Sequence, residues 1–166
     1  MITFPGTILV IPTYNCGNQI YNLLTKLKNT NIENHFEFVL LIDNCSQDKT
    51  VEIAQDFYLA NHIKWLRLAK NKKNYGLGGT HKAAIKFCIQ SSYKNLVILH
   101  GDDQGDITDL IANAHEILST ENCAAFLGAR FMKNSKLIGY SKIRIAGNFL
   151  LNLLMSIATK RKIHDM

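Results

Sequence analysis

Four carboxylates follow a strongly apolar run near the middle of the chain. The run LVIL occupies residues 96–99, and Asp102, Asp103, Asp106 and Asp109 come within the next ten residues. Carboxylates this close repel one another, and the repulsion opposes their ionisation. A divalent cation that prefers oxygen ligands, Mg²⁺ or Mn²⁺, would relieve this repulsion. The stretch therefore predicts a metal site in which the cation bridges protein carboxylates to the phosphates of a substrate.

Helix capping is the simpler explanation for part of this acidic cluster. Acidic side chains are favourable at a helix N-terminus, and Asp106 and Asp109 precede or open a helical pattern. Capping does not require Asp102 and Asp103 as well, so these two remain the candidate metal ligands.

A glycine-rich turn, NYGLGG, spans residues 74–79 and precedes another helical pattern. Backbone N–H groups at such a turn can face an anion, and Lys82 lies just beyond it. The spacing matches neither the Walker A loop nor the dinucleotide-binding fingerprint. A purely structural turn explains Gly76 and Gly78 as well as phosphate binding does.

Two further polar positions come directly after apolar runs. Asp43 ends one run, and its carboxylate could accept the ring N–H of a nucleotide base. Tyr14 follows the first run, where an aromatic ring could stack on a base. Asp48 is better explained as an acid at the start of a helix.

Apolar runs and helical patterns alternate along the chain. The alternation predicts an α/β fold with a doubly wound, mostly parallel sheet and right-handed crossovers. Ligands of such sheets bind at the carboxyl ends of the strands, where the polar clusters fall. The expected strands are 7–12, 36–43, 63–68, 95–100 and 124–129, and the expected helices are 17–29, 48–60, 79–90 and 108–118.

Composition favours one domain over residues 1–166. The chain has 166 residues, 47% of them hydrophobic, and both of its prolines lie near the start, so no proline-rich linker divides it. Its four cysteines are widely spaced and lack zinc-site spacing, which favours a reducing compartment. The first residues lack the features of a signal peptide, so we expect a cytoplasmic location.

Positive charge is concentrated in the last part of the chain. From Arg130 onward there are eight Lys or Arg residues and one acid, within a net charge of +6 for the whole sequence. This portion predicts an anionic partner, either a phosphate-rich ligand or a membrane surface, although a solvated basic face explains it equally well. Basic and aromatic residues are not interleaved, so we expect no nucleic-acid partner.

The segment 143–162 is apolar in its middle and basic at both ends. Its uncharged part, residues 145–158, is shorter than the roughly 20 residues that cross a bilayer. It fits either a core helix or a helix lying at a membrane interface.

The order of several short motifs resembles that of the family 2 glycosyltransferases with the GT-A fold. The resemblance extends in particular to polyprenyl-phosphate sugar transferases such as the dolichyl-phosphate mannose synthases. The matching pieces run from about residue 7 to the end of the chain: VIPTYN (10–15), LIDNCSQDKT (41–50), NYGLGG (74–79), ILHGDDQGD (98–106) and GARF (128–131).

The resemblance implies a set of nucleotide-binding residues. Asp43 matches the acid that recognises the base, and Gly76 and Gly78 match the glycine turn beside the nucleotide. Phosphate contacts are implied for Lys82 and Arg130. The first loop would contact the base through Pro12, Tyr14 and Asn15.

The metal motif departs from the family pattern. The family shows D-x-D, and alignment by Gln104 places His100 at the first acid and Asp102 at the second. His100 could take the missing role, or Asp102 and Asp103 could together supply both carboxylates, or metal binding could be weakened. We expect Asp102 to be the main ligand of Mg²⁺ or Mn²⁺ and a catalytic residue, with Asp103 and His100 as further ligands.

The implied reaction is transfer of a hexose from a UDP- or GDP-sugar, with inversion, to a lipid phosphate such as a polyprenyl phosphate, or to a glycan. A hydroxyl acceptor would need a base, and Asp165 is the one acid after residue 121. The sequence stops at KIHDM, without the serine and glycine of the family's following motif. We therefore expect residues 1–166 to be a catalytic domain cut inside its acceptor region, located in the cytoplasm or at the cytoplasmic face of a membrane.

Two other functions compete with this interpretation. The replaced first acid and the short C-terminal part also fit a module of the same fold that binds a sugar nucleotide without turnover. A nucleotidyltransferase is disfavoured, because the loop TYNCGN after the first strand contains no Lys or Arg.

Overall fold

The computed structural model describes residues 3–113, 116–117, 125, 128 and 141–163. The chain divides into two compact units, Met1–Ser119 and Thr120–Met166, and each is described by itself. Whether they act as the single predicted domain stays a prediction.

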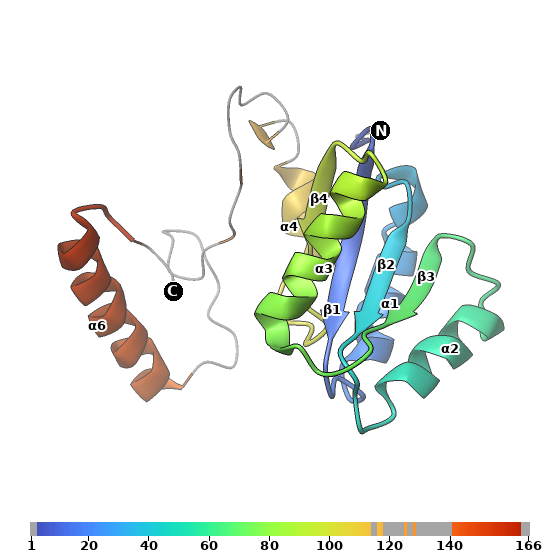
Figure 1. Ribbon diagram of the computed structural model, residues 1–166, viewed down its shortest axis with the longest axis horizontal. Coiled ribbons are helices and arrows are strands. Elements are labelled where there is room, and N and C mark those ends of the chain that lie inside the picture. The colour runs from blue at the N-terminus through green and yellow to red at the C-terminus, as the bar shows by residue number, and fades with distance from the viewer. Residues whose placement is uncertain (1–2, 114–115, 118–124, 126–127, 129–140, 164–166) are drawn as a thin grey trace. The chain divides into compact units, whose positions relative to one another are not determined.

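The first unit contains a four-stranded parallel sheet (Figure 1). Its strands are β1 (Thr7–Thr13), β2 (Val39–Asp43), β3 (Leu66–Lys70) and β4 (Asn95–Ile98), in the order β3-β2-β1-β4. The chain thus adds β2 and β3 on one side of β1 and then returns to add β4 on the other. This reversal of strand order confirms the α/β, mostly parallel fold and marks the switch point where ligands of such sheets bind.

Helices cover both faces of the sheet because the strand side chains alternate between the faces. Leu9, Ile11 and Leu41 face the buried residues of α1 (Ile20–Asn29) and α2 (Thr50–Ala60), together with Ile107 of α4 (Ile107–Ala112). Ile8, Val10 and Leu40 face α3 (Gly76–Gln90), which lies on the opposite face (Figure 1). A short 3₁₀ helix, η1 (Ile32–Asn34), leads into β2.

The predicted elements agree with the structure best at the sheet centre. Every residue of β1 and β2 is buried, as continuous apolar runs predict. β3 begins three residues later than the expected 63–68. Ile63 and Trp65 precede it and pack in the core, and the Trp65 carbonyl accepts from the Val39 N–H of β2 at 2.7 Å. β3 is an edge strand of the described sheet, and its last four residues are exposed. The expected strand 124–129 lies largely outside the described residues.

The second unit contains α6 (Lys142–Thr159), which corresponds to the apolar segment predicted from the sequence. Ser141 caps it by accepting a hydrogen bond from the Arg144 N–H. Within the described residues, none of the helices combines the length and the apolar character needed to cross a bilayer.

Candidate functional site

The loop after β2 is built around a buried carboxylate. Asp43 is 1% exposed, and its two oxygens lie 3.1 and 3.2 Å from the Ser46 backbone nitrogen, which donates to them. Ser46 Oγ in turn accepts from the Asn15 N–H at 2.9 Å, and Asn15 Oδ1 accepts from the Gln47 N–H. Asn15 and Asp43 therefore fix the loops after β1 and β2 against each other.

Asp48 joins the same two loops at the start of α2. Its carboxylate accepts from the Thr50 N–H at 3.0 Å and from the Gly17 N–H at 2.8 Å. Burial by itself raises the pKa of Asp48, but these bonds and the Thr50 hydroxyl outweigh it, and the pKa lies below its ordinary value. The interpretation of Asp48 as a helix-start acid is confirmed.

Asn44 links the loop after β2 to the start of α3. Its Nδ2 donates to Asn74 Oδ1 at 2.8 Å, and its Oδ1 accepts from Asn71 Nδ2 and from the Tyr75 N–H, both at 2.9 Å. Asn71 also donates to Thr80 Oγ1. Asn44 is 3% exposed, so this amide cluster is a built part of the site and not a surface contact.

These residues enclose a pocket of about 260 Å³ at the carboxyl ends of β1 and β2. Its lining consists of Pro12, Thr13, Tyr14, Asn44, Asn74, Gly76, Leu77 and Thr80. Tyr14 is 45% exposed, which leaves its ring accessible to a ligand. Of the residues predicted to bind a nucleotide, the pocket gathers Pro12, Tyr14 and Gly76.

The glycines of residues 76–79 have different roles. Gly76 has φ +68°, a conformation that favours glycine, and a Cβ on Gly79 would collide with the Tyr75 side chain. Gly78 faces open space, so the backbone gives no steric reason for a glycine there. Lys82 is exposed on α3 and does not line the pocket.

The end of β4 continues alongside β1 and brings the acidic stretch to the same sheet edge. The Leu99 N–H donates to the Val10 carbonyl and the Gly101 N–H to the Pro12 carbonyl, at 3.0 and 3.1 Å. A Cβ on Gly101 would lie 2.5 Å from Thr13 Cγ2, so this close approach requires glycine.

The two central carboxylates of the stretch are held differently. Asp102 Oδ1 accepts from the Gln104 N–H at 3.2 Å, which leaves its other oxygen available. Asp103, at φ +57°, forms an ion pair with Lys26 of α1, and both of its oxygens lie 2.9 Å from Lys26 Nζ. Asp106 accepts from the Thr108 N–H at the start of α4, so its predicted capping role is confirmed.

The donor set suits a divalent cation only in part. The carboxylate of Asp102 and the imidazole of His100 are suitable ligand types. In the part of the chain that the structure describes, however, no three His, Cys, Asp or Glu side chains are grouped as metal ligands. A bound ion would therefore take further ligands from water or from the phosphates of a substrate.

Sequence reasoning missed one residue beside His100. His81 of α3 has its ring centroid 5.3 Å from that of His100, with the planes tilted by 47°. Burial, and to a smaller extent His100, lowers the pKa of His81, so the ring is neutral at pH 7. No sequence spacing signals this pair, because only the packing of α3 beside β4 brings the two rings together. Sequence reasoning also missed four polar residues of the site: Asn44, Asn71, Asn74 and Thr80. Two of these could have been noticed as turn signals, because Asn44 directly follows Asp43 and Asn74 comes two residues before Gly76.

Arg130 and Asp165 lie outside the described residues. Their predicted roles, in phosphate binding and as the base for a hydroxyl acceptor, stay predictions.

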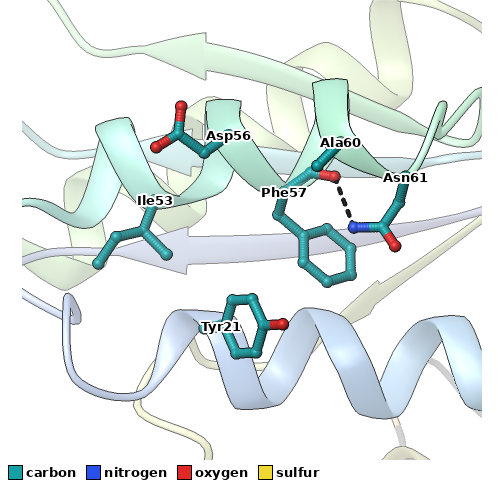
Figure 2. A pocket seen from close by; sticks show the side chains of 6 residues that line it. All are labelled: Tyr21, Ile53, Asp56, Phe57, Ala60 and Asn61. Atoms are coloured by element: carbon teal, nitrogen blue, oxygen red, sulfur yellow. Dashed lines mark hydrogen bonds between the residues drawn. The ribbon is translucent and has the colours of Figure 1, made fainter.

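A second pocket, of about 300 Å³, lies between α1 and α2, away from the strand ends (Figure 2). Tyr21 of α1 faces Phe57 of α2 there, edge to face with centroids 5.7 Å apart. Asp56 is the one carboxylate in the lining. Asn61 Nδ2 donates a hydrogen bond to the Phe57 carbonyl. Its lining contains none of the residues at the carboxyl ends of the strands, so it lacks the constellation that the sequence predicted.

Comparison with protein families matches almost the whole chain to one of them. The model of glycosyl transferase family 2 covers residues 8–165. The chain belongs to this family. A curated relative, the uncharacterized glycosyltransferase YfnE of Bacillus subtilis (strain 168), is 28% identical over 111 residues, which are 65% of this chain and 26% of that protein.

Solved structures show the same fold. S. aureus TarS 1–349 has a TM-score of 0.52 at 20% identity, over 76% of this chain and 40% of its own. The mannosyltransferase PcManGT from Pyrobaculum calidifontis, in complex with GDP-Man and Mn²⁺, has a TM-score of 0.51 at 21% identity, over 70% of this chain and 33% of its own. The TarS fragment in complex with UDP-GlcNAc also has a TM-score of 0.51 at 20% identity, over 76% of this chain and 38% of its own. This chain thus spans well under half the length of the relatives it matches, and it shares their GT-A fold.

Proposed function

We propose that this chain binds a nucleotide-sugar donor and forms the donor side of a hexosyltransferase. The observation that carries the proposal is the pocket at the carboxyl ends of β1 and β2, in a chain of glycosyl transferase family 2. Two of the structural neighbours are complexes, one with UDP-GlcNAc and one with GDP-Man, so a UDP- or GDP-sugar is the proposed donor.

In the proposed complex the base enters beside Tyr14, whose exposed ring offers a stacking face. Asp43 accepts an N–H of the base. Asp43 is 1% exposed and does not line the pocket, and the Ser46 N–H lies close to both of its oxygens, so this contact requires the loop after β2 to shift when the base binds. Pro12 and Asn15 shape the first loop, Gly76 and Gly78 border the nucleotide, and Lys82 and Arg130 neutralise its phosphates.

We propose Asp102 as the main protein ligand of a divalent metal, with Mg²⁺ or Mn²⁺ as the candidates. When bound, the ion would stabilise the negative charge that develops on the diphosphate leaving group. Asp103 would join it only after its ion pair with Lys26 opens, because Lys26 engages both of its oxygens.

The proposed acceptor is a polyprenyl phosphate or a glycan, reached at the cytoplasmic face of a membrane. α6 supports a membrane contact, since it exposes apolar side chains such as Ile143, Leu153 and Ile157. Basic residues stand at both ends of this helix, including Lys142 and Lys160, as in interfacial helices that bind anionic lipid. Asp165 is the proposed base if the acceptor is a hydroxyl.

Calorimetric titration of UDP and GDP, each with and without Mn²⁺, tests the donor site. We expect metal-dependent binding of one nucleotide. Asp43→Asn should weaken that binding about 10- to 100-fold, because hydrogen bonds to charged groups contribute about 1.5–3 kcal/mol. The asparagine keeps an oxygen for the Ser46 N–H, so the loop stays held. Asp56→Asn, at an exposed position of α2 away from the carboxyl ends of the strands, is the matched control. Absence of binding by either nucleotide to the folded chain would refute the proposal.

A second candidate is a module that binds the donor without turnover. This candidate is favoured by the described part of the chain, in which no three His, Cys, Asp or Glu side chains are grouped as metal ligands. Donor hydrolysis and donor binding, measured on the same sample, separate the two candidates. Binding with no release of free sugar under any metal favours the module, and sugar release that Asp102→Ala abolishes favours the enzyme.

A further inference from the structure

Two histidines from different elements meet beside the acidic stretch. His81 lies in α3, and His100 comes directly after β4, with ring centroids 5.3 Å apart. Neither ring lines the pocket at the ends of β1 and β2, so the proposed nucleotide contacts do not use them.

One nitrogen of this pair is buried without a partner. His81 Nε2 is inaccessible to solvent and makes no hydrogen bond to any described residue. Buried polar atoms are normally paired, and an exception calls for an explanation, such as an ion that the nitrogen would ligate.

The separation of the rings suits a shared metal ion. Imidazole nitrogens bind zinc at about 2.0–2.1 Å, and the ring centroid lies roughly 1 Å behind the ligating nitrogen. Two imidazoles on one ion at a near-tetrahedral angle therefore have centroids about 5 Å apart. Packed aromatic rings also lie about 4.5–7 Å apart, so it is the buried, unpaired His81 nitrogen and not the separation that distinguishes a metal site from a packing contact here.

We propose that His81 and His100 together bind one divalent transition-metal ion, of the class of Co²⁺, Ni²⁺ or Zn²⁺, in preference to Mg²⁺. Imidazole suits these ions, whereas Mg²⁺ prefers oxygen ligands. Water completes the coordination in the free protein. Oxygens of the donor diphosphate replace that water when the donor is bound, and this last step alone rests on the proposed function.

The test is a titration of Co²⁺ into the full chain without a histidine tag and without nucleotide, followed by visible absorption and calorimetry. We expect one ion to bind, with nitrogen and oxygen ligation. His81→Gln and His100→Gln should each lower the affinity at least tenfold, and excess Mg²⁺ should not compete. His62→Asn is the matched control, because His62 is exposed at φ +50°, which asparagine tolerates, and it should leave the affinity unchanged.

A second measurement keeps the proposal testable if a variant fails to fold. In the unaltered protein, bound Co²⁺ should shift the imidazole proton resonances of two histidines and leave those of the others in place. Co²⁺ affinity that survives both substitutions, a spectrum dominated by thiolate ligands, or no binding to the folded chain would each overturn the proposal.

Failure of this inference and failure of the proposed function are distinguishable. If the chain binds a nucleotide but has no affinity for Co²⁺, only the proposed histidine site is contradicted. If the chain binds Co²⁺ through the two histidines but binds neither UDP nor GDP, only the proposed donor site is contradicted.

Discussion

At the scale of single residues, Asp48 shows how one carboxylate stabilises two loops. It receives hydrogen bonds from Thr50 and from Gly17, so Asp48→Ala removes the acceptor of the first N–H of α2 and frees the first loop. We expect the free energy of unfolding to fall by about 1 kcal/mol at pH 7, the usual effect of losing such a cap. Urea unfolding measures it, with Asp56→Ala, an exposed position in the same helix, as the control. Equal stability of the two variants would contradict the role.

The same carboxylate should make stability depend on pH in the acid range. The pKa of Asp48 is lower in the folded chain than its ordinary value of about 3.9. Its contribution is therefore fully present above about pH 5 and is lost as pH falls through the folded-state pKa. The stabilities of the unaltered chain and Asp48→Ala should converge as pH is lowered. A difference that does not shrink as pH falls would show that the stabilisation does not depend on ionisation.

Asp103 shows where sequence reasoning about single residues ends. The clustering of Asp102 and Asp103 correctly marked the sheet edge that carries the candidate site. It could not show that Lys26, 77 positions away along the chain, neutralises Asp103. The repulsion that suggested a metal is thus partly relieved by a lysine from α1.

At the scale of elements, Asn44 connects β2 to the turn that opens α3. Asn44→Ala would remove the side-chain acceptor of the Tyr75 N–H and one of the two acceptors of the Asn71 amide, and both of these bonds are partly buried. Unsatisfied buried groups cost about 1–3 kcal/mol each, so we expect a loss of at least that size in the free energy of unfolding. Hydrogen exchange should speed up in residues 71–76 more than in β1. Asn61→Ala, which removes the bonds of Asn61 to the Phe57 carbonyl and from Lys28 Nζ, away from the loops after β2 and β3, is the control. Unchanged exchange in residues 71–76 would contradict the connection.

The first turn of α3 separates structural from functional glycines. Gly78→Ala places a Cβ in open space and should stabilise the helix by up to about 1 kcal/mol, since alanine is the better helix former. Gly79→Ala should destabilise the chain, because its Cβ meets the Tyr75 side chain. Thermal unfolding measures both. If Gly78 borders the bound nucleotide as proposed, Gly78→Ala should be more stable and yet bind UDP or GDP more weakly. Unchanged nucleotide affinity would show that Gly78 is not part of the binding site.

The sequence predicted elements well where local pattern and burial agree. The apolar runs of β1 and β2 and the stripe of Ile20, Leu23, Leu24 and Leu27 in α1 are all found buried as expected. The predicted strand began three residues before β3, because Ile63 and Trp65 are apolar and buried ahead of the strand, and an apolar pattern does not distinguish such residues from strand residues. The amide cluster and the histidine pair depend on contacts between distant elements, which no local pattern encodes.

At the scale of the whole molecule, the core and the basic helix belong to different units. Both hydrophobic clusters consist of residues between Phe4 and Ile111, whereas α6 lies in the unit from Thr120 onward. A fragment of residues 1–119 keeps both clusters and should therefore unfold cooperatively. Its free energy of unfolding should lie within about 1 kcal/mol of that of the full chain.

The same fragment should lose association with vesicles of anionic phospholipid, because it lacks α6 and its basic ends. The full chain with Lys160, Arg161 and Lys162 changed to Gln is the matched control, and it should keep its stability while losing vesicle association at low salt. Vesicle binding by the fragment would place the membrane contact in the first unit, and a fragment that fails to fold would show that residues after 119 complete the core.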